Sequence, residues 1–213
     1  MISDPLLGKL FDLYNFGLYP SLYCWSRCRS SPFQEMEKHI PREGLIYDFG
    51  CGEGVFANFL SLKSADREVI GIELLNRKFQ VAKLSGERNT ERIKFINVDV
   101  TNKEFVLSNC NGVILSDFLH HIHYDAQQFL LRKIFRCLNP DGTLLIRDVD
   151  KNYFSWRFWG NFILEFILYP FQKYYFRSSK ELLSQLTKIG FKVKYVLAKE
   201  GLPFSSSLYI CKK

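Results

Sequence analysis

The hydrophobic pattern changes regularly from residue 45 onward, because short apolar runs alternate with amphipathic segments. Runs such as GLIYDF and GTLLIRDV have the length and apolar content of buried strands, whereas NRKFQVAKLSGE places its apolar residues at helical spacing. Strands that alternate with helices form βαβ units, which build a parallel sheet with helices on both faces. The expected strands cover residues 44–49, 68–73, 92–100, 111–117 and 142–149, and the expected helices cover residues 54–63, 76–87 and 126–138.

The last part of the chain has a different order of elements. A helix is expected over residues 180–190, closed by Gly190, and two strands follow at 191–198 and 206–213. Consecutive strands joined by a turn pair antiparallel. The sequence therefore predicts an α/β fold with a mostly parallel seven-stranded sheet that ends in an antiparallel C-terminal edge hairpin.

Two segments lie outside this alternation. Residues 1–44 are expected to form one or two aromatic-rich helices, and residues 151–177 insert between the fifth strand and the next helix. We expect a single domain over residues 1–213. Its parts are a helical cap at 1–44, a ligand-binding core at 45–150, an aromatic helical insertion at 151–177, and a C-terminal helix and strand pair at 178–213.

The turn after the first strand is rich in glycine and reads Asp48-Phe49-Gly50-Cys51-Gly52-Glu53-Gly54. In open parallel sheets ligands bind beyond the carboxyl ends of the strands, and glycines at this turn let the backbone approach them closely. The GxGxG spacing differs from the GxGxxG pattern of nicotinamide and flavin proteins, which disfavours an oxidoreductase. The buried charge of Asp48 would repel a diphosphate and attract an ammonium or sulfonium group.

Five motifs follow one another along the chain: LIYDFGCGEG, IGIELL, INVDV, ILSDFLHHI and LNPDGTLLIRD. Over roughly residues 45–150 the sequence thereby resembles the class I S-adenosylmethionine-dependent methyltransferases of the small-molecule type. The resemblance implies a Rossmann-like methyltransferase fold, S-adenosylmethionine as cofactor and S-adenosylhomocysteine as its product.

The resemblance also implies roles for individual residues. The Glu73 carboxylate would accept the ribose hydroxyls, Asp99 and the backbone of Val100 would bind the adenine, and Leu74 would pack on the nucleoside. Asp48 would hold the ammonium group of the methionine part. Each residue alone also fits an ordinary role as turn glycine, solvated acid or turn cap. The expected cofactor-binding residues are Asp48, Phe49, Gly50, Cys51, Gly52, Glu73, Leu74, Asp99, Val100, Ser116 and Asp117.

The segment after the fourth strand holds the candidates for acid–base chemistry. His121 or His120 is suited to act as a general base toward an oxygen or carbon nucleophile, since imidazole titrates near neutral pH. Asp148, at the end of the fifth strand, is a second candidate. Each histidine fits a structural role equally well, and their spacing disfavours a metal site. The tetrapeptide (N/D)PP(Y/F), typical of family members that methylate exocyclic amines, is absent.

Aromatic residues are concentrated in the insertion, which reads KNYFSWRFWGNFILEFILYPFQKYYFR. Such a segment packs against other helices, lines an apolar substrate pocket, or lies on an anionic membrane surface. The N-terminal segment is likewise rich in aromatic residues. Its Tyr14, Tyr19 and Tyr23 are candidates for a cap over the cofactor, with Arg27 beside them. The expected acceptor is therefore a small hydrophobic or lipid-linked molecule.

Composition and charge narrow the remaining alternatives. The chain has 213 residues and a net charge of +7, which favours anionic partners. The six cysteines include no CxxC pair, and the N-terminus lacks the pattern of a signal peptide, so a cytoplasmic protein is expected, with peripheral contact at the inner face of a membrane as a further option. No segment has the length and apolarity of a membrane span. The sequence leaves the oligomeric state open.

Two other functions stay open at this stage. An RNA methyltransferase would suit the positive charge, although Lys and Arg are spread along the chain and no RNA-binding module is present, which disfavours nucleic acid as a partner. A catalytically silent methyltransferase-like binding protein would retain the glycine turn without turning over. The leading hypothesis is an enzyme that transfers a methyl group from S-adenosylmethionine by in-line displacement.

Overall fold

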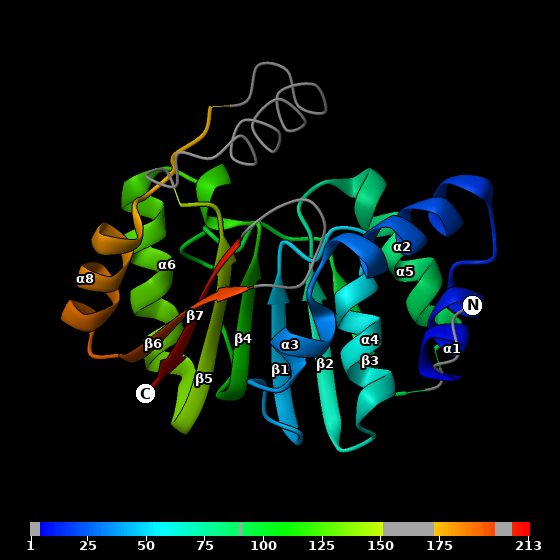
Figure 1. Cartoon of the computed structure of the whole chain (residues 1–213), viewed down its shortest axis with the longest axis horizontal. Helices are drawn as coiled ribbons and strands as arrows, with labels where there is room; N and C mark the ends of the chain where they lie inside the picture. The colour runs from blue at the N-terminus through cyan, green and yellow to red at the C-terminus, as the bar shows by residue number, and fades with distance from the viewer. Residues whose placement is uncertain (1–4, 90, 151–172, 199–205) are drawn as a thin grey trace.

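The fold is given by a computed structural model that describes residues 5–89, 91–150, 173–198 and 206–213. The seven strands of the sheet lie in the order β3-β2-β1-β4-β5-β7-β6 (Figure 1). The first five strands in this order are parallel to one another, and β7 is antiparallel to both β5 and β6. The strands are β1 (Gly44–Phe49), β2 (Arg67–Ile72), β3 (Ile93–Ile96), β4 (Cys110–Ser116), β5 (Leu138–Asp148), β6 (Lys192–Ala198) and β7 (Ser206–Lys212).

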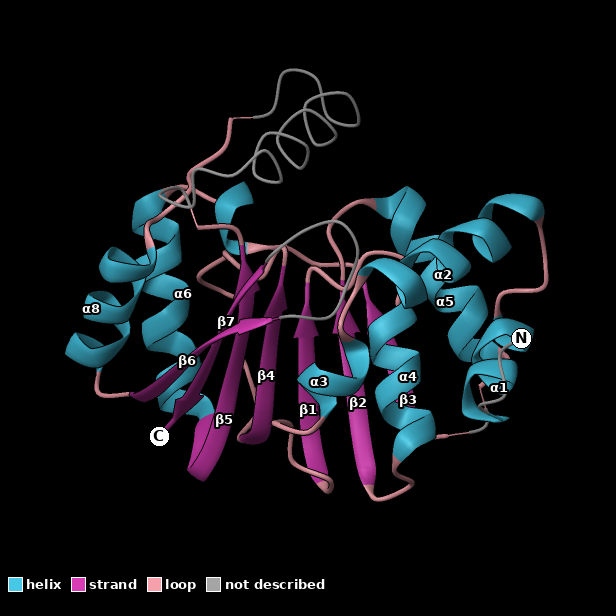
Figure 2. Ribbon diagram, in the orientation of Figure 1, coloured by secondary structure: helices cyan, strands magenta, loops and turns pink. Residues whose placement is uncertain are grey.

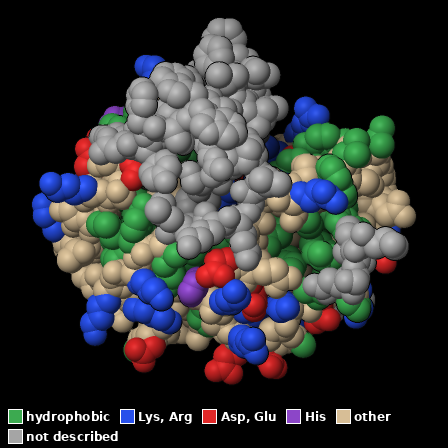
Figure 3. All heavy atoms as spheres, viewed as in Figure 1, with side chains coloured by type: hydrophobic (Ala, Val, Ile, Leu, Met, Phe, Trp, Pro, Cys, Tyr) green, Lys and Arg blue, Asp and Glu red, His purple; other side chains and the backbone are tan. Residues whose placement is uncertain are grey.

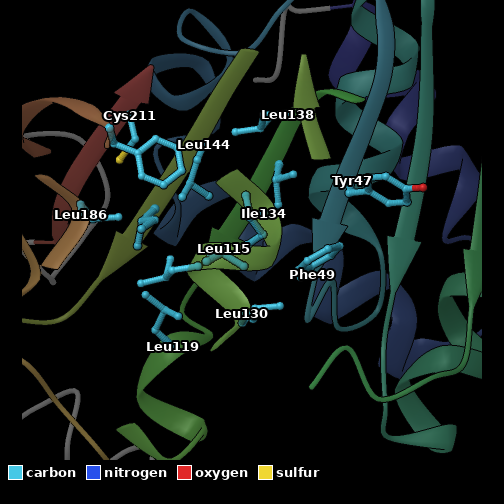
Figure 4. Close-up of a cluster of buried hydrophobic side chains, with 14 of the residues drawn as sticks. Tyr47, Phe49, Leu115, Leu119, Leu130, Ile134, Leu138, Leu144, Leu186 and Cys211 are labelled. Atoms are coloured by element: carbon cyan, nitrogen blue, oxygen red, sulfur yellow. The ribbon is translucent and has the colours of Figure 1, made fainter. Parts of the chain in front are cut away.

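Helices cover both faces of this sheet (Figure 2). One core packs α6 and α8 on the sheet, and a second core packs the N-terminal helices and α4 on the other face. Figure 4 shows the first core, where Leu130 and Ile134 of α6 meet Leu115 and Leu144 of the strands. The helical elements are α1 (Pro5–Leu13), α2 (Leu18–Ser30), α3 (Phe33–Glu37), α4 (Val55–Lys63), α5 (Asn76–Glu87), η1 (Leu119–His121), α6 (Tyr124–Cys137) and α8 (Ser179–Ile189).

The burial of the central strand β4 on both faces of the sheet explains why its residues Val113, Ile114 and Leu115 are all apolar. Val113 and Leu115 belong to one core and Ile114 belongs to the other, and all three side chains are fully buried. Successive side chains of a strand point to opposite faces, so a strand covered by helices on both sides buries every residue. The predicted mostly parallel sheet with an antiparallel C-terminal edge is confirmed.

Several element boundaries differ from the prediction. The third strand ends at Ile96 instead of residue 100, because Asn97 turns its side chain onto the backbone of Glu73 and Leu74 and the chain leaves the sheet. The fifth strand begins at Leu138, four residues early, since Leu138 already pairs with Cys110 before an irregularity in register. The N-terminal segment contains three helices where one or two were expected. Gly190 ends α8 with a φ of 120°, as its position predicts.

A buried ion pair fastens the N-terminal helices to the sheet. Arg67 of β2 lies 2.8 Å from the carboxylate of Glu37 in α3, and both side chains are almost completely buried. The same guanidinium donates to the carbonyl oxygens of Ile40, Pro41 and Leu60. Its hydrogen-bonding capacity is thus used within the protein, which is what a buried arginine requires.

Most of the aromatic insertion, residues 151–172, lies outside the described residues, as does the turn around Pro203. None of the helices in the described part of the chain is long and apolar enough to cross a bilayer.

Candidate cofactor and active site

The glycine turn lies at the carboxyl end of β1 and is held against β2. The backbone N–H groups of Gly50 and Cys51 both donate to the carbonyl oxygen of Ile72. Gly50 and Gly52 have φ values of 68° and 59°, in the left-handed region that favours glycine. A Cβ atom on Gly52 would meet only the Tyr23 hydroxyl of α2, 3.5 Å away. The space beside the Gly52 backbone is therefore open on the side that faces the N-terminal helices.

Glu73 comes directly after β2 and is oriented by the backbone on both sides. Its Oε2 accepts a hydrogen bond from the Gly52 N–H at 2.9 Å, and its Oε1 accepts one from the Leu75 N–H at 2.7 Å. A carboxylate oxygen has two lone pairs, so one remains on each oxygen. The two remaining acceptor sites suit the neighbouring hydroxyls of a ribose.

Asp48 is the buried carboxyl group beneath this turn. Its residue is 2% exposed, and none of the described residues donates a hydrogen bond to its carboxylate. Burial raises the pKa of Asp48 to about 7, with Glu73 adding to the rise and Arg27 opposing it. A nearby cationic ligand stabilises the ionised form of a buried acid, because the opposite charge offsets part of the lost hydration.

The ends of β2 and β3 are joined beside the predicted adenine site. The Asn97 amide donates to the carbonyl oxygens of Glu73 and Leu74. Asp99 caps a turn through Oδ1, which accepts from the N–H and hydroxyl of Thr101, and its Oδ2 takes no hydrogen bond among the described residues. Val100 is buried, whereas Leu74 is 58% exposed. The exposed apolar surface of Leu74 would suit packing against a planar ligand.

Asp117 lies at the end of β4, in a left-handed conformation with a φ of 54°. Its carboxylate contacts the guanidinium of Arg147 in β5 and lies 3.5 Å from that of Arg27 in α2. Burial acts to raise the pKa of Asp117, but the charges of Arg147 and Arg27 outweigh it and leave the pKa below its usual value. This ion-pair group ties α2 to the strand ends. Ser116, the last residue of β4, is half-buried and lies opposite Arg147 in the sheet.

His120 and Asp148 form a close pair across the ends of β4 and β5. Nδ1 of His120 lies 2.5 Å from Oδ1 of Asp148, and the His120 backbone N–H donates to Oδ2 at 3.3 Å. Because the carboxylate accepts, the proton of a neutral imidazole lies on Nδ1, and Nε2 carries the lone pair. The rings of Phe176 and Tyr174 lie 5.0 and 6.0 Å from that of His120. The arrangement orients the imidazole within aromatic surroundings.

His121 has a different environment from its neighbour. Its ring lies 4.1 Å from that of His120 and 5.6 Å from that of Tyr174. Burial lowers the pKa of His121 to about 3, and the nearby charges of His120 and Lys78 lower it further. His121 is therefore a neutral ring at physiological pH and a weak base.

Sequence reasoning missed several residues that build this site. Arg147 could have been noticed as a lone arginine in the apolar run TLLIRDV. Nothing in the pattern singled out Asn97. The flagged tyrosines of the cap do reach the glycine turn, because the hydroxyls of Tyr14 and Tyr19 donate to the backbone oxygen and the side chain of Glu53 at 2.8 and 2.6 Å. Among the described residues, no group of three His, Cys, Asp or Glu side chains could hold a metal ion.

Comparisons with known proteins agree with this geometry. The sequence model described as "Methyltransferase domain" matches residues 27–196. A carboxy-S-adenosyl-L-methionine synthase of Desulfotalea psychrophila is 27% identical over 145 residues, which are 66% of this chain and 58% of that protein. The mitochondrial ubiquinone biosynthesis O-methyltransferase of Saccharomyces cerevisiae is 26% identical over 146 residues, which are 67% of this chain and 46% of that enzyme. The chain thus spans about half the length of these two relatives.

The solved structures show the same fold at low sequence identity. Magnesium protoporphyrin IX methyltransferase of Synechocystis PCC 6803, determined with bound S-adenosylhomocysteine, is 16% identical and superimposes with a TM-score of 0.66 over 97% of this chain and 94% of that one. A glycine turn open to a ligand, an oriented acid after β2 and a family match over most of the sequence agree with one another. The chain belongs to the class I S-adenosylmethionine-dependent methyltransferases.

Proposed function

We propose that the protein transfers a methyl group from S-adenosylmethionine to an oxygen or carbon atom of a small, hydrophobic or lipid-linked acceptor. The observation that carries this proposal is the His120–Asp148 pair, 2.5 Å between Nδ1 and Oδ1, at the strand ends next to the glycine turn. A base held in this way serves nucleophiles that must lose a proton, such as a hydroxyl group or an activated carbon.

The chain offers a matching residue for each part of the cofactor. Glu73 would bind the ribose hydroxyls, Asp99 and Val100 the adenine, with Leu74 packed on the nucleoside. Asp48 would hold the ammonium group while the main chain at 49–52 lies along the methionine part, and Ser116 and Asp117 would close the site from β4. When bound, S-adenosylmethionine supplies a methyl group on a positively charged sulfur. The buried carboxyl of Asp48, which lacks a hydrogen-bond donor among the described residues, fits the cationic ammonium group of the same cofactor.

The role of His120 follows from its contacts. Nε2 would take the proton of the acceptor hydroxyl as the oxygen attacks the methyl carbon, and that proton would afterwards pass to water. Asp148 holds the imidazole in the tautomer with Nδ1–H and stabilises the cation that forms, as an oriented carboxylate does for a histidine base. Between the two histidines, the low pKa of His121 favours His120 as the base.

Two features support an apolar acceptor. The His120 ring lies among Tyr174 and Phe176, so a bound acceptor would meet aromatic surfaces there. The α2 helix exposes Leu18, Leu22 and Trp25 at 78, 56 and 47%, at spacings that place them on one side of the helix. Figure 3 shows hydrophobic side chains exposed on the viewed face. The exposed apolar side of α2, beside the cofactor site, suits peripheral contact with a membrane that holds a lipid-like acceptor.

The relatives favour a second candidate, the formation of carboxy-S-adenosylmethionine. The Desulfotalea relative and several others similar to this chain are named carboxy-S-adenosyl-L-methionine synthases. In that case the Arg27 and Arg147 guanidiniums, which lie at the strand ends, would face a carboxylate-bearing substrate. The yeast relative, named an O-methyltransferase, favours the first candidate.

One experiment separates the candidates. The protein is incubated with S-adenosylmethionine labelled in the methyl group, with a bacterial lipid extract, and with a water-soluble metabolite extract as the source of carboxyl donors. The products are identified by mass spectrometry. The proposal predicts a labelled, solvent-extractable acceptor and S-adenosylhomocysteine, both lost in His120→Gln and retained in His123→Asn. His123 is an exposed N-cap of α6, and asparagine preserves that cap. A sulfonium product that carries a new carboxyl group would select the second candidate, and label in added RNA would overturn both.

A further inference from the structure

The connection between β3 and β4 is unusual for a parallel sheet. Parallel strands are normally joined by a helix that packs on the sheet, yet residues 97–109 contain no helix. Instead they form tight turns in which Asp99 caps Thr101 and Asn102 caps Glu104. A hollow of about 480 Å³ lies between this connection and α6. Its size lies within the range of small-molecule sites, about 300–1,000 Å³.

The hollow has an apolar floor that is open to solvent. Phe105, Val106 and Leu107 contribute from the connection, and Phe129 contributes from α6. Val106 is 82% exposed and Phe129 is 38% exposed. Large apolar side chains left open in a concave surface mark a binding site more often than a random surface does.

The charged side chains that line the hollow, which form its rim, are all cationic. Lys103, Arg132, Lys133 and Arg136 line it, together with the neutral Asn109, and no acidic side chain does. In the part of the chain that the structure describes, none of these four cations forms an ion pair. The nearest acid in sequence, Glu104, is exposed and does not line the hollow. Four like charges without a counterion attract an anion.

Lys133 shows how the floor and rim are combined. Its Nζ donates to the carbonyl oxygen of Asn102 at 3.3 Å and lies 5.0 and 5.8 Å from the ring centres of Phe105 and Phe129. Partial burial lowers the pKa of Lys133, and no carboxylate opposes this effect. The ammonium is therefore positioned over the apolar floor, where one end of a ligand could meet charge and the other could meet rings.

This hollow is separate from the methyl-transfer site. Helix α6 begins at Tyr124, next to the His120 turn, and ends at Cys137. Arg132, Lys133 and Arg136 lie on its last two turns. The β4 strand likewise begins at Cys110, beside Cys137, and ends at Ser116 by the cofactor site. The two sites thus lie toward opposite ends of the same strand and helix.

We propose that the hollow binds one small anionic amphiphile, with its carboxylate held by Arg132, Lys133 and Arg136 and its chain lying on Phe105, Val106 and Phe129. The chemical class is that of a free fatty acid, since the rim supplies charge for one anionic head and the floor supplies area for one apolar chain. The hollow is open to solvent, and its volume of about 480 Å³ is the size of a site for a single small molecule. This site is independent of the proposed acceptor.

Decanoate, below its micelle concentration, is the probe, and binding is measured by calorimetry on the full chain. We expect saturable binding, with decanol and acetate each binding at least about tenfold more weakly, since each lacks one half of the interaction. Arg132→Gln with Arg136→Gln should weaken decanoate binding about tenfold, because two charge contacts are lost. Val106→Asp should do the same by placing a negative charge on the floor.

The matched control is Lys180→Gln with Lys188→Gln, which removes the same charge from exposed positions of α8 and should leave decanoate binding unchanged. The Kd for S-adenosylhomocysteine should be equal in all variants. That result would show that each variant is folded and that the cofactor site is distinct from the hollow. Equal decanoate affinity in all variants would overturn the proposal. So would selective loss, in the Arg132 and Arg136 variant, of binding to anionic vesicles or to single-stranded RNA while decanoate binding persists.

Discussion

Nδ1 of His120 and Oδ1 of Asp148 lie 2.5 Å apart although 28 residues separate them in sequence. The contact joins the turn after β4 to the end of β5, and the His120 backbone N–H adds a second bond to the same carboxylate. The carboxylate thereby fixes both the position of the imidazole and the nitrogen that carries its proton. The pair holds the imidazole of His120 in one orientation at the edge of the sheet where the glycine turn lies.

Replacing either member of this pair should reduce catalysis without reducing cofactor binding. His120→Gln removes the base and should lower kcat by about 10²–10⁴-fold, and Asp148→Asn should lower it through the wrong tautomer. The measurement is kcat with the acceptor found in the lipid-extract experiment, together with the Kd for S-adenosylhomocysteine. An unchanged kcat in His120→Gln, or a parallel loss of cofactor affinity, would contradict a role as base.

His121 provides a comparison within the same turn. Because its pKa is lowered to about 3 by burial, His121 is uncharged throughout the pH range in which the enzyme is assayed. A general base loses activity at low pH, where it is protonated, so kcat should fall on the acidic side of its pH profile. His121→Asn should leave this acidic fall in place, even if the magnitude of kcat decreases through altered packing. Disappearance of that acidic fall in His121→Asn would move the base from His120 to His121.

Asp48 predicts a specific dependence of stability on pH. Its pKa is raised from 3.8 to about 7 by burial, so between these values the folded protein holds a proton that the unfolded chain releases. The contribution of Asp48 to stability is then fully present below about pH 4 and is lost as pH rises through about 7. Asp48→Asn removes this pH-dependent loss of stability, because an amide does not ionise. Without cofactor, the Tm of the wild type relative to Asp48→Asn should fall between pH 5 and pH 8, and a constant difference would refute the buried-acid explanation.

The Arg67–Glu37 pair should contribute strongly to the stability of the N-terminal cap. Glu37→Gln leaves a buried guanidinium without its counterion, which costs about 3–5 kcal/mol when one partner of a buried pair is removed. The value should lie toward the lower end because three carbonyl oxygens still accept from Arg67. Urea unfolding measures the change.

The Arg92–Glu68 pair is a suitable control for that experiment. It joins β2 to the residue before β3 at 3.4 Å, but Arg92 is 66% exposed, so Glu68→Gln should change the free energy of unfolding by less than about 1 kcal/mol. Equal effects of Glu37→Gln and Glu68→Gln would mean that the buried pair adds no more than a surface contact.

The mostly parallel sheet with an antiparallel C-terminal edge could be predicted from sequence, because the buried strands are short apolar runs and most of the segments between them have helical spacing. The glycine turn and Glu73 were identifiable for the same reason, since they follow directly from strand ends. The Asp117–Arg147–Arg27 group was not, because it joins residues from three elements that only the fold brings together. The early end of β3 was missed because INVDV reads as a strand, whereas the Asn97 side chain instead bonds the backbone after β2.

The cofactor site depends most directly on the oriented carboxylate of Glu73. Calorimetric titration with S-adenosylhomocysteine tests this site without knowledge of the acceptor. We predict binding in the micromolar range for the wild type and a loss of about 100-fold in Glu73→Ala, since charge-assisted hydrogen bonds contribute about 1.5–3 kcal/mol each. Glu87→Ala, at the exposed end of α5, should bind like the wild type. Absence of binding to folded wild-type protein, or equal affinity in Glu73→Ala, would contradict the cofactor site described for this chain.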